Sequence, residues 1–333
     1  MQFGIFGSAQ ANSSNLGSGV GQGFDEYIEY NIEAEALGYY STFLVEHHFT
    51  GWSQVSSTLN LLTWLASRTS SLRVGTAVLV LPWHNPVLLA EQVATLDLLS
   101  KGRLDFGIGK GYRHNEFNGF CIPQEEAEAR FEESLKLLIK SWTSKERFSF
   151  EGKFFKFQDI IVEPSPWTKP HPPIWMAAGS NESICKVADR GFNLLLDQFA
   201  SPELLSERIT LFKTEVERRG RVFNPLEIAV ARDVFVAKNE EDKQAAHQRH
   251  RAFRDRVLAV SRAPGQTTGA HILSYQKESD RAQDQTLFGT PDEINEKLEE
   301  LRKVGVHYIL CNSTGSSRDS MRRFAKELMC EYV

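Results

Sequence analysis

Short apolar runs alternate with longer stretches of helical periodicity along almost the whole chain. Most of the apolar runs are continuous, as in parallel strands that are buried on both faces. The predicted strands lie at residues 2–6, 41–47, 73–81, 103–109, 174–178, 192–197, 227–237 and 307–312. The predicted helices lie at residues 25–38, 55–70, 86–100, 125–143, 182–190, 202–219, 240–259 and 291–304.

This alternation of eight strands with eight helices predicts an α/β fold, a (β/α)8 TIM barrel with insertions. A doubly wound open sheet is the alternative, but the regular alternation and the count of strands favour the barrel. The helix boundaries agree, because Pro86 and Pro291 begin predicted helices and Gly102 and Gly305 follow their ends. We expect a single domain over residues 1–333.

Two segments are longer than the connections of a plain barrel. Residues 144–173 contain alternating aromatic residues around Glu151-Gly152, which predicts a small hairpin followed by a proline-rich return. Residues 261–289 form a long polar connection before the last helix, and such connections inside a compact domain are usually functional or disordered. One interpretation is that this second segment folds over the mouth of the barrel.

Composition narrows the class of protein. The chain is 41% hydrophobic and 24% charged, with a net charge of −5, as in a soluble globular protein. No basic cluster indicates nucleic-acid binding, no apolar run approaches the roughly 18 residues of a membrane helix, and the segment MQFGIFGSAQ does not resemble a signal peptide. The four cysteines form no CxxC pair, which favours reduced thiols in the cytoplasm over a disulfide framework.

Ionisable and aromatic residues gather where the predicted strands end. Because chemistry in such barrels takes place at the carboxyl ends of the strands, we expect these residues to share one rim. The segments concerned are Glu46-His47-His48, Pro82-Trp83-His84-Asn85-Pro86, Gly109-Lys110-Gly111-Tyr112-Arg113-His114 and Gly179-Ser180-Asn181.

One use of such a rim is metal binding. In principle, His47, His84 and His114 would make a three-histidine zinc site. His47 and His48 would not both face one ion while the strand stays regular, because adjacent strand residues point to opposite sides. No HxH pair occurs and nothing fixes a fourth, acidic ligand, so ordinary hydrogen-bonded loop histidines are the competing interpretation.

A second use is phosphate binding. The segment GSNES at 179–183 follows a strand and opens a helix, and the free backbone N–H groups of a helix start favour an anion. Ser180 is the expected N-cap, Gly179 permits close approach, and Lys110 adds positive charge. An ordinary capped helix explains the same segment. GIGKG at 107–111 is not a dinucleotide fingerprint, because Tyr112 occupies the third glycine position.

Three segments together resemble one family. EHHFT, VGTAVLVLPWHNPVLLAEQVATLDLLSKGRLDFGIGKG and GTPDE are similar to segments of the bacterial luciferase-like flavin monooxygenases. The resemblance covers nearly the whole chain and is densest over residues 36–120.

This resemblance implies a barrel that binds reduced FMN (FMNH2) at the carboxyl ends of its strands. With O2, the flavin would give a C4a-hydroperoxide that attacks a small-molecule substrate such as an aldehyde. The resemblance makes His47 the catalytic residue and places a non-proline cis peptide under the flavin, between Ala77 and Val78. The remaining cofactor-binding residues that it implies are Lys110, Tyr112, Gly179, Ser180 and Ser183.

Imidazole chemistry fits that role for His47, because the ring titrates near neutral pH and can exchange protons with a reacting group. Glu46 and His48 then orient the strand end. An aromatic set would exclude water from the site, although each member is also explained by packing. The set consists of Phe6, Phe49, Trp83 and Tyr112.

The chain also departs from the light-emitting luciferase subunit. That subunit has a cysteine in place of Gly109, an arginine in place of Lys110 and a glutamate in place of Gly179. These differences are compatible with flavin binding and argue against light emission. The prediction is a two-component monooxygenase, served by a separate NAD(P)H:flavin reductase, without a metal and with an unassigned substrate.

Three alternatives remain. An F420-dependent oxidoreductase would use the same kind of barrel, but EHHFT favours FMN. A non-catalytic flavin-binding protein is disfavoured by the retained His47 and the full set of strands, and a metal hydrolase would need bound metal. Family members commonly pair the helices that correspond to 55–70 and 86–100, so we expect a homodimer.

Overall fold

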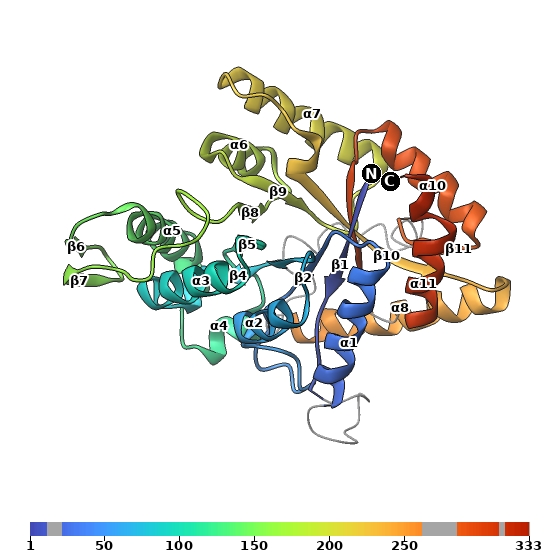
Figure 1. Ribbon diagram of the computed structural model, residues 1–333, viewed down its shortest axis with the longest axis horizontal. Helices are drawn as coiled ribbons and strands as arrows, with labels where there is room; N and C mark the ends of the chain where they lie inside the picture. Colours follow the sequence, from blue (N-terminus) through green and yellow to red (C-terminus); the bar gives the residue numbers. More distant parts are fainter. Residues whose placement is uncertain (12–21, 262–284, 313–316, 333) are drawn as a thin grey trace.

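The computed structural model describes residues 1–11, 22–261, 285–312 and 317–332. The predicted (β/α)8 barrel is confirmed, because parallel strands pair in a closed ring whose last strand returns to the first. Helices surround the ring, as Figure 1 shows. The ring consists in spatial order of β1 (Gln2–Gly7), β2 (Ser41–Leu44), β3 (Arg73–Thr76), β5 (Leu104–Gly109), β8 (Ile174–Ala177), β9 (Asn193–Leu196), β10 (Ile228–Val236) and β12 (Tyr308–Asn312).

Helices predicted from periodicity form around the barrel. Two helices, α4 and α11, were not predicted. The short strand β11 (Leu287–Gly289), which pairs with the end of β10, was not predicted either. The helices are α1 (Gln22–Ala36), α2 (Thr58–Arg68), α3 (Pro86–Leu99), α4 (His114–Gly119), α5 (Ala127–Thr143), α6 (Asn181–Arg190), α7 (Pro202–Arg218), α8 (Glu240–Ser261), α10 (Pro291–Lys303) and α11 (Arg318–Glu327).

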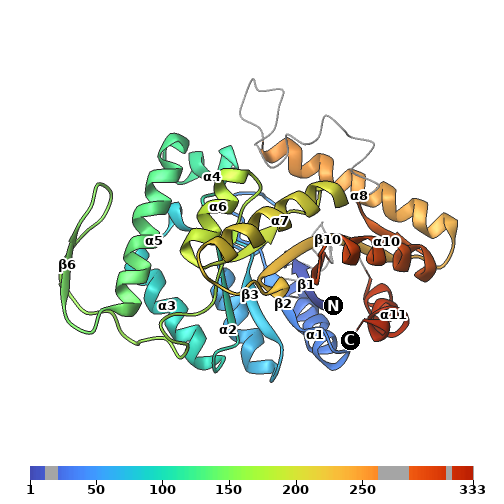
Figure 2. The same cartoon turned by 90° about the horizontal axis from the view of Figure 1, so that it is seen from above.

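The two long insertions follow α5 and α8. The hairpin around Glu151-Gly152 is confirmed as β6 (Phe148–Glu151) and β7 (Lys156–Ile160), which project beyond α5 in Figure 2. Of the polar connection at 261–289, residues 262–284 lie outside the described residues, so the interpretation that it covers the barrel mouth stays a prediction.

Large side chains fill the barrel interior near the amino ends of the strands. Phe43, Trp175 and Tyr308 pack edge to face there, with ring centroids 5.8–5.9 Å apart. Gly75 makes room for this layer, since a Cβ at that position would lie 2.6 Å from the Phe43 ring. Because this end is filled, the open space of the barrel lies at the carboxyl ends of the strands.

The third predicted strand, 73–81, is not continuous, which is a correction. It breaks into β3 and β4 (Leu79–Val80), and the peptide bond between Ala77 and Val78 is cis. Thr76 and Gly107 hold the break in place, because the Thr76 hydroxyl donates to the Gly107 carbonyl at 2.6 Å and accepts from its N–H at 2.9 Å.

The second predicted strand is also shorter than expected. It ends at Leu44 instead of residue 47, so Glu46, His47 and His48 lie on the irregular segment that follows it. The argument that strand alternation separates the two histidines required a regular strand, and that condition is not met. The two side chains instead contact different carboxylates, His47 that of Glu116 and His48 that of Glu46.

Candidate active site

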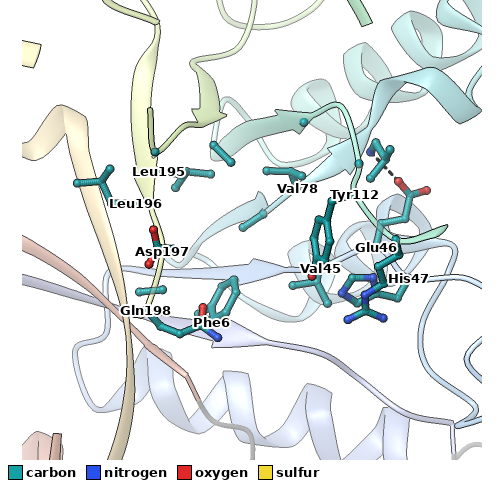
Figure 3. A pocket seen from close by; sticks show the side chains of 18 of the residues that line it. Phe6, Val45, Glu46, His47, Val78, Tyr112, Leu195, Leu196, Asp197 and Gln198 are labelled. Atoms are coloured by element: carbon teal, nitrogen blue, oxygen red, sulfur yellow. Dashed lines mark hydrogen bonds between the residues drawn. The ribbon is translucent and has the colours of Figure 1, made fainter. Parts of the chain in front are cut away.

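The carboxyl ends of the barrel strands surround a cavity of about 770 Å³, a size typical of small-molecule sites. Figure 3 shows Tyr112, Glu46 and His47 at one end of it and Asp197 and Gln198 at the other, with Val78 between. The structure brings all the predicted site residues to this cavity. They are His47, Ala77, Val78, Lys110, Tyr112, Gly179, Ser180 and Ser183.

His47 is held by a carboxylate that the sequence analysis did not identify. Its Nδ1 lies 3.1 Å from Oε1 of Glu116, and that oxygen also accepts the backbone N–H of His48 at 2.8 Å. An ionised carboxylate only accepts hydrogen bonds, so Nδ1 carries the proton and Nε2 of the neutral ring is an acceptor. The His47 side chain is 14% exposed and lines the cavity.

Burial lowers the pKa of His47 below its usual value, because desolvation disfavours the charged ring. The hydrogen bond and charge of Glu116 oppose this shift, and the positive charge of Arg113 reinforces it. At neutral pH the ring is therefore neutral and able to accept a proton.

Glu46 has a structural role beside His47. Its Oε1 accepts from Nε2 of His48 at 3.1 Å and from Nε2 of His84 at 2.8 Å, and its Oε2 accepts the N–H of Val80 at 2.7 Å. Burial raises its pKa, but these hydrogen bonds outweigh burial and the pKa is lowered overall. Glu46 thus ties the EHH segment to β4, in agreement with the predicted orienting role.

The start of α6 and the two lysines beside it have features that suit an anion, and we call this part of the cavity the anion-binding corner. Ser180 is the N-cap, as predicted, and its hydroxyl accepts the N–H of Ser183 at 3.3 Å in a capping box. Lys110 and Lys186 both reach Glu128, at 2.8 Å and 3.5 Å. The hydrogen bond from Lys110 lowers the pKa of Glu128, so the carboxylate stays ionised between the two ammonium groups.

Lys186 was missed by sequence reasoning. It lies one turn into α6 and lines the cavity, but its sequence neighbours give no sign that it faces Lys110. The hydrogen bond that Lys186 donates to Glu182 is the largest cause that raises its pKa, so it remains a cation. The corner therefore presents to the cavity a helix N-terminus and two cations, which are paired with Glu128 and Glu182.

Apolar side chains also line the cavity, and we call them the apolar bed. They belong to Phe6, Ala77, Val78 and Leu195. Gly109 permits the close approach of β5 and the Ala77-Val78 segment, since a Cβ on Gly109 would lie 2.5 Å from a Val78 methyl group.

The predicted aromatic set divides in two. Phe6 and Tyr112 line the cavity as expected, whereas Phe49 and Trp83 do not. Phe49 and Trp83 pack instead on Phe120, with ring centroids 4.9 Å and 5.4 Å away. For these two residues, the packing interpretation applies.

Another polar group on the cavity wall was not predicted. Asp233 accepts from Asn312 at 2.7 Å and faces Nε2 of His250 at 3.2 Å. These residues lie on β10, β12 and α8, which are distant in sequence, so only the barrel brings them together.

The structure does not gather the three histidines of the metal interpretation. His47 contacts Glu116 and His84 contacts Glu46. His114 begins α4 and does not line the cavity. Within residues 1–11, 22–261, 285–312 and 317–332, no group of three or more His, Cys, Asp or Glu is arranged to hold a metal ion. In the same ranges, no helix has the length and apolar character to cross a membrane.

The apolar bed, the anion-binding corner and the buried histidine thus line one cavity of a (β/α)8 barrel. The luciferase-like monooxygenase family matches residues 1–308, and the chain belongs to that family. The predicted family is confirmed.

The chain is similar to several monooxygenases. The oxygenase component of flavin-dependent trigonelline monooxygenase from Acinetobacter baylyi is 29% identical over 69% of this chain and 64% of its own length. FMNH2-dependent dimethylsulfone monooxygenase from Pseudomonas putida is 28% identical over 74% of this chain and 70% of its own length. The crystal structure of monooxygenase RslO1 from Streptomyces bottropensis has a TM-score of 0.86 at 26% identity and covers 100% of both chains. The chain spans 48–64% of the length of the first curated relatives that it matches.

Proposed function

We propose that this protein is the oxygenating component of a two-component monooxygenase that uses reduced FMN and O2 to oxygenate a small organic substrate. A separate NAD(P)H:flavin reductase would supply the reduced flavin. When bound, reduced FMN supplies the oxygenating chemistry with O2, and the C4a-hydroperoxide expected from the family resemblance belongs to this proposal.

The observation that carries the proposal is the arrangement of the anion-binding corner beside the apolar bed. FMN has one terminal phosphate and one flat ring system. Lys110, Lys186 and the N–H groups at the start of α6 suit the phosphate, since charge-assisted hydrogen bonds and a helix N-terminus both favour an anion. The bed of Ala77 and Val78 suits the ring.

Four residues would act on the bound ligands. Lys110 and Lys186 would hold the phosphate, and Tyr112 would close the cavity beside the ring. His47 would accept or return a proton through Nε2, because Glu116 keeps the proton of the neutral ring on Nδ1. Apolar walls would exclude bulk water from the reacting atoms.

Cofactor binding tests the proposal without a known substrate. The protein is titrated anaerobically with reduced FMN, reduced FAD and reduced F420, and oxygen consumption is then followed after mixing with O2. We expect reduced FMN to bind most tightly and to consume O2 in the bound state. Equal binding of FAD, exclusive binding of F420, or no binding of any flavin would each overturn the proposal.

We also propose that the protein forms a homodimer in which α2 and α3 make the interface. Trp64 on α2 and Leu88 and Leu99 on α3 are large apolar side chains that are more than half exposed, and a second copy would cover them. Sedimentation velocity should give a dimer for the wild type, and Trp64→Glu should shift it toward monomer. A wild-type monomer at micromolar concentration would refute the dimer.

A further inference from the structure

Arg113 is a buried cation that faces the cavity. It is the residue before α4, it is 3% exposed, and it lines the cavity together with His47 and Tyr112. Its guanidinium carbon lies 5.9 Å from the centre of the Tyr112 ring. The positive charge of Arg113 helps to lower the pKa of His47.

The guanidinium lacks the partners that a buried arginine requires. Its Nε and Nη1 are buried and have no hydrogen-bond partner among the described residues. No carboxylate of that part of the chain lies within ion-pair distance of it either. Burying an uncompensated charge is strongly unfavourable, so such a group calls for an anionic partner.

Half-buried Arg73 and buried Arg232 show what a structural role of an arginine looks like in this chain. Arg73 makes two hydrogen bonds to Asp105, at 2.8 Å and 2.9 Å. Arg232, which is 1% exposed, donates to the carbonyls of Asp197, Ala231 and Ala200. Arg113 differs from both because its free donors belong to a side chain that borders a cavity.

We propose that Arg113 binds the carboxylate of the substrate, and that the substrate is a small organic acid whose carboxylate is held beside His47. This inference rests on the proposed function, which assigns the FMN phosphate to Lys110 and Lys186 and so leaves Arg113 for a second anion. A planar guanidinium matches a carboxylate in shape and charge. The neighbouring walls, which include Val45, Trp52 and Tyr112, suit the hydrocarbon part of such an acid.

Ligand binding to the whole protein tests this assignment. The probes are benzoate, cyclohexanecarboxylate and hexanoate, each paired with its neutral amide, and binding is measured by calorimetry with oxidised FMN present. We expect at least one acid to bind the wild type about 10-fold or more tighter than its amide, as for a charge-assisted hydrogen bond in a buried site. Arg113→Gln should abolish this preference, and Arg113→Lys should retain part of it.

Two further measurements make the result specific. Arg302→Gln, which removes an exposed arginine paired with Glu299, should leave the acid preference unchanged. Binding of a preferred acid should raise the pKa of His47, followed by NMR, because the acid offsets the charge of Arg113. Circular dichroism melting shows whether each variant is folded.

Distinct outcomes would overturn distinct statements. If FMN binds but no acid is preferred over its amide, or if Arg113→Gln keeps the preference, the inference is wrong. If Arg113→Gln weakens reduced FMN binding and leaves acid binding intact, the partner of Arg113 is the flavin and the inference is also wrong. Failure of the wild type to bind reduced FMN would instead overturn the proposed function.

Discussion

Replacing Glu116 with glutamine changes the partner of His47 while almost preserving its shape. In the wild type, one carboxylate oxygen receives both Nδ1–H of His47 and the N–H of His48. Glutamine keeps an oxygen acceptor, but it removes the negative charge and adds an NH2 donor. The hydrogen bond to His47 becomes a neutral one, and the alternative tautomer of the ring becomes accessible.

The size of the effect follows from the buried position of this pair. Glu116 is 1% exposed, so solvent screens its charge weakly. Charge-assisted hydrogen bonds are worth about 1.5–3 kcal/mol and neutral ones about 1 kcal/mol, so the expected loss is about 0.5–2 kcal/mol. Through His47, this corresponds to a proton transfer that is slower by roughly 2- to 30-fold.

The pH dependence has a defined sign. Burial already lowers the pKa of His47, and Glu116 partly opposes that shift. Without the negative charge, the pKa of His47 falls further. Because the neutral ring is the form that accepts a proton, the acidic limb of the pH–rate profile moves to lower pH in Glu116→Gln.

Histidine NMR in the full-length protein gives a direct assay. Long-range ¹H–¹⁵N spectra should show the Nδ1–H tautomer of His47 in the wild type, and in Glu116→Gln a lower pKa with a mixture of tautomers. Glu126→Gln is the matched control, because Glu126 forms an ion pair with Arg130 and does not line the cavity. An unchanged pKa and tautomer of His47 in folded Glu116→Gln protein would refute the reasoning.

The remaining predictions concern the anion-binding corner and the two histidines. Lys110→Ala should weaken FMN binding by about 1 kcal/mol, roughly 5-fold, because the Lys110 side chain is 58% exposed and its charge is screened by solvent. Lys186→Ala should have a similar effect. Unchanged FMN titration curves for both variants would show that the phosphate binds elsewhere. Glu128→Gln should tighten FMN binding a few-fold by removing a carboxylate that competes with the phosphate, and weaker binding would contradict this. His47→Ala should cut product formation by about 10²–10⁴ and release hydrogen peroxide instead. His48→Ala should have a smaller effect, because His48 contacts Glu46. Peroxide and product assays compare the two variants, and normal coupling of oxygen use to product formation in His47→Ala would contradict the role of that ring.

Local sequence patterns determined the barrel and most of its parts. Buried parallel strands are continuous apolar runs, and amphipathic helices repeat every turn, so both leave signals within a short window. Proline and glycine at helix ends, as at Pro291 and Gly305, are local as well. The same holds for the Ser180 capping box, which depends on residues three apart.

Strand ends were harder to predict, for a physical reason. Where the third strand breaks, the Thr76 side chain bonds to the backbone of Gly107, which lies on another strand. The second strand ends at Leu44, although the apolar run continues to Val45. Pairing partners, and not composition, decide where a ladder of hydrogen bonds stops.

Only the tertiary structure decided which charges meet. The sequence placed His47 and Lys110 on one rim, but it gave no sign that Glu116 would hold His47 or that Lys186 would share Glu128 with Lys110. Helix α4, which carries Glu116, is too short for its periodicity to stand out. Contacts between side chains on different barrel elements depend on closure of the ring, and no local pattern records that closure.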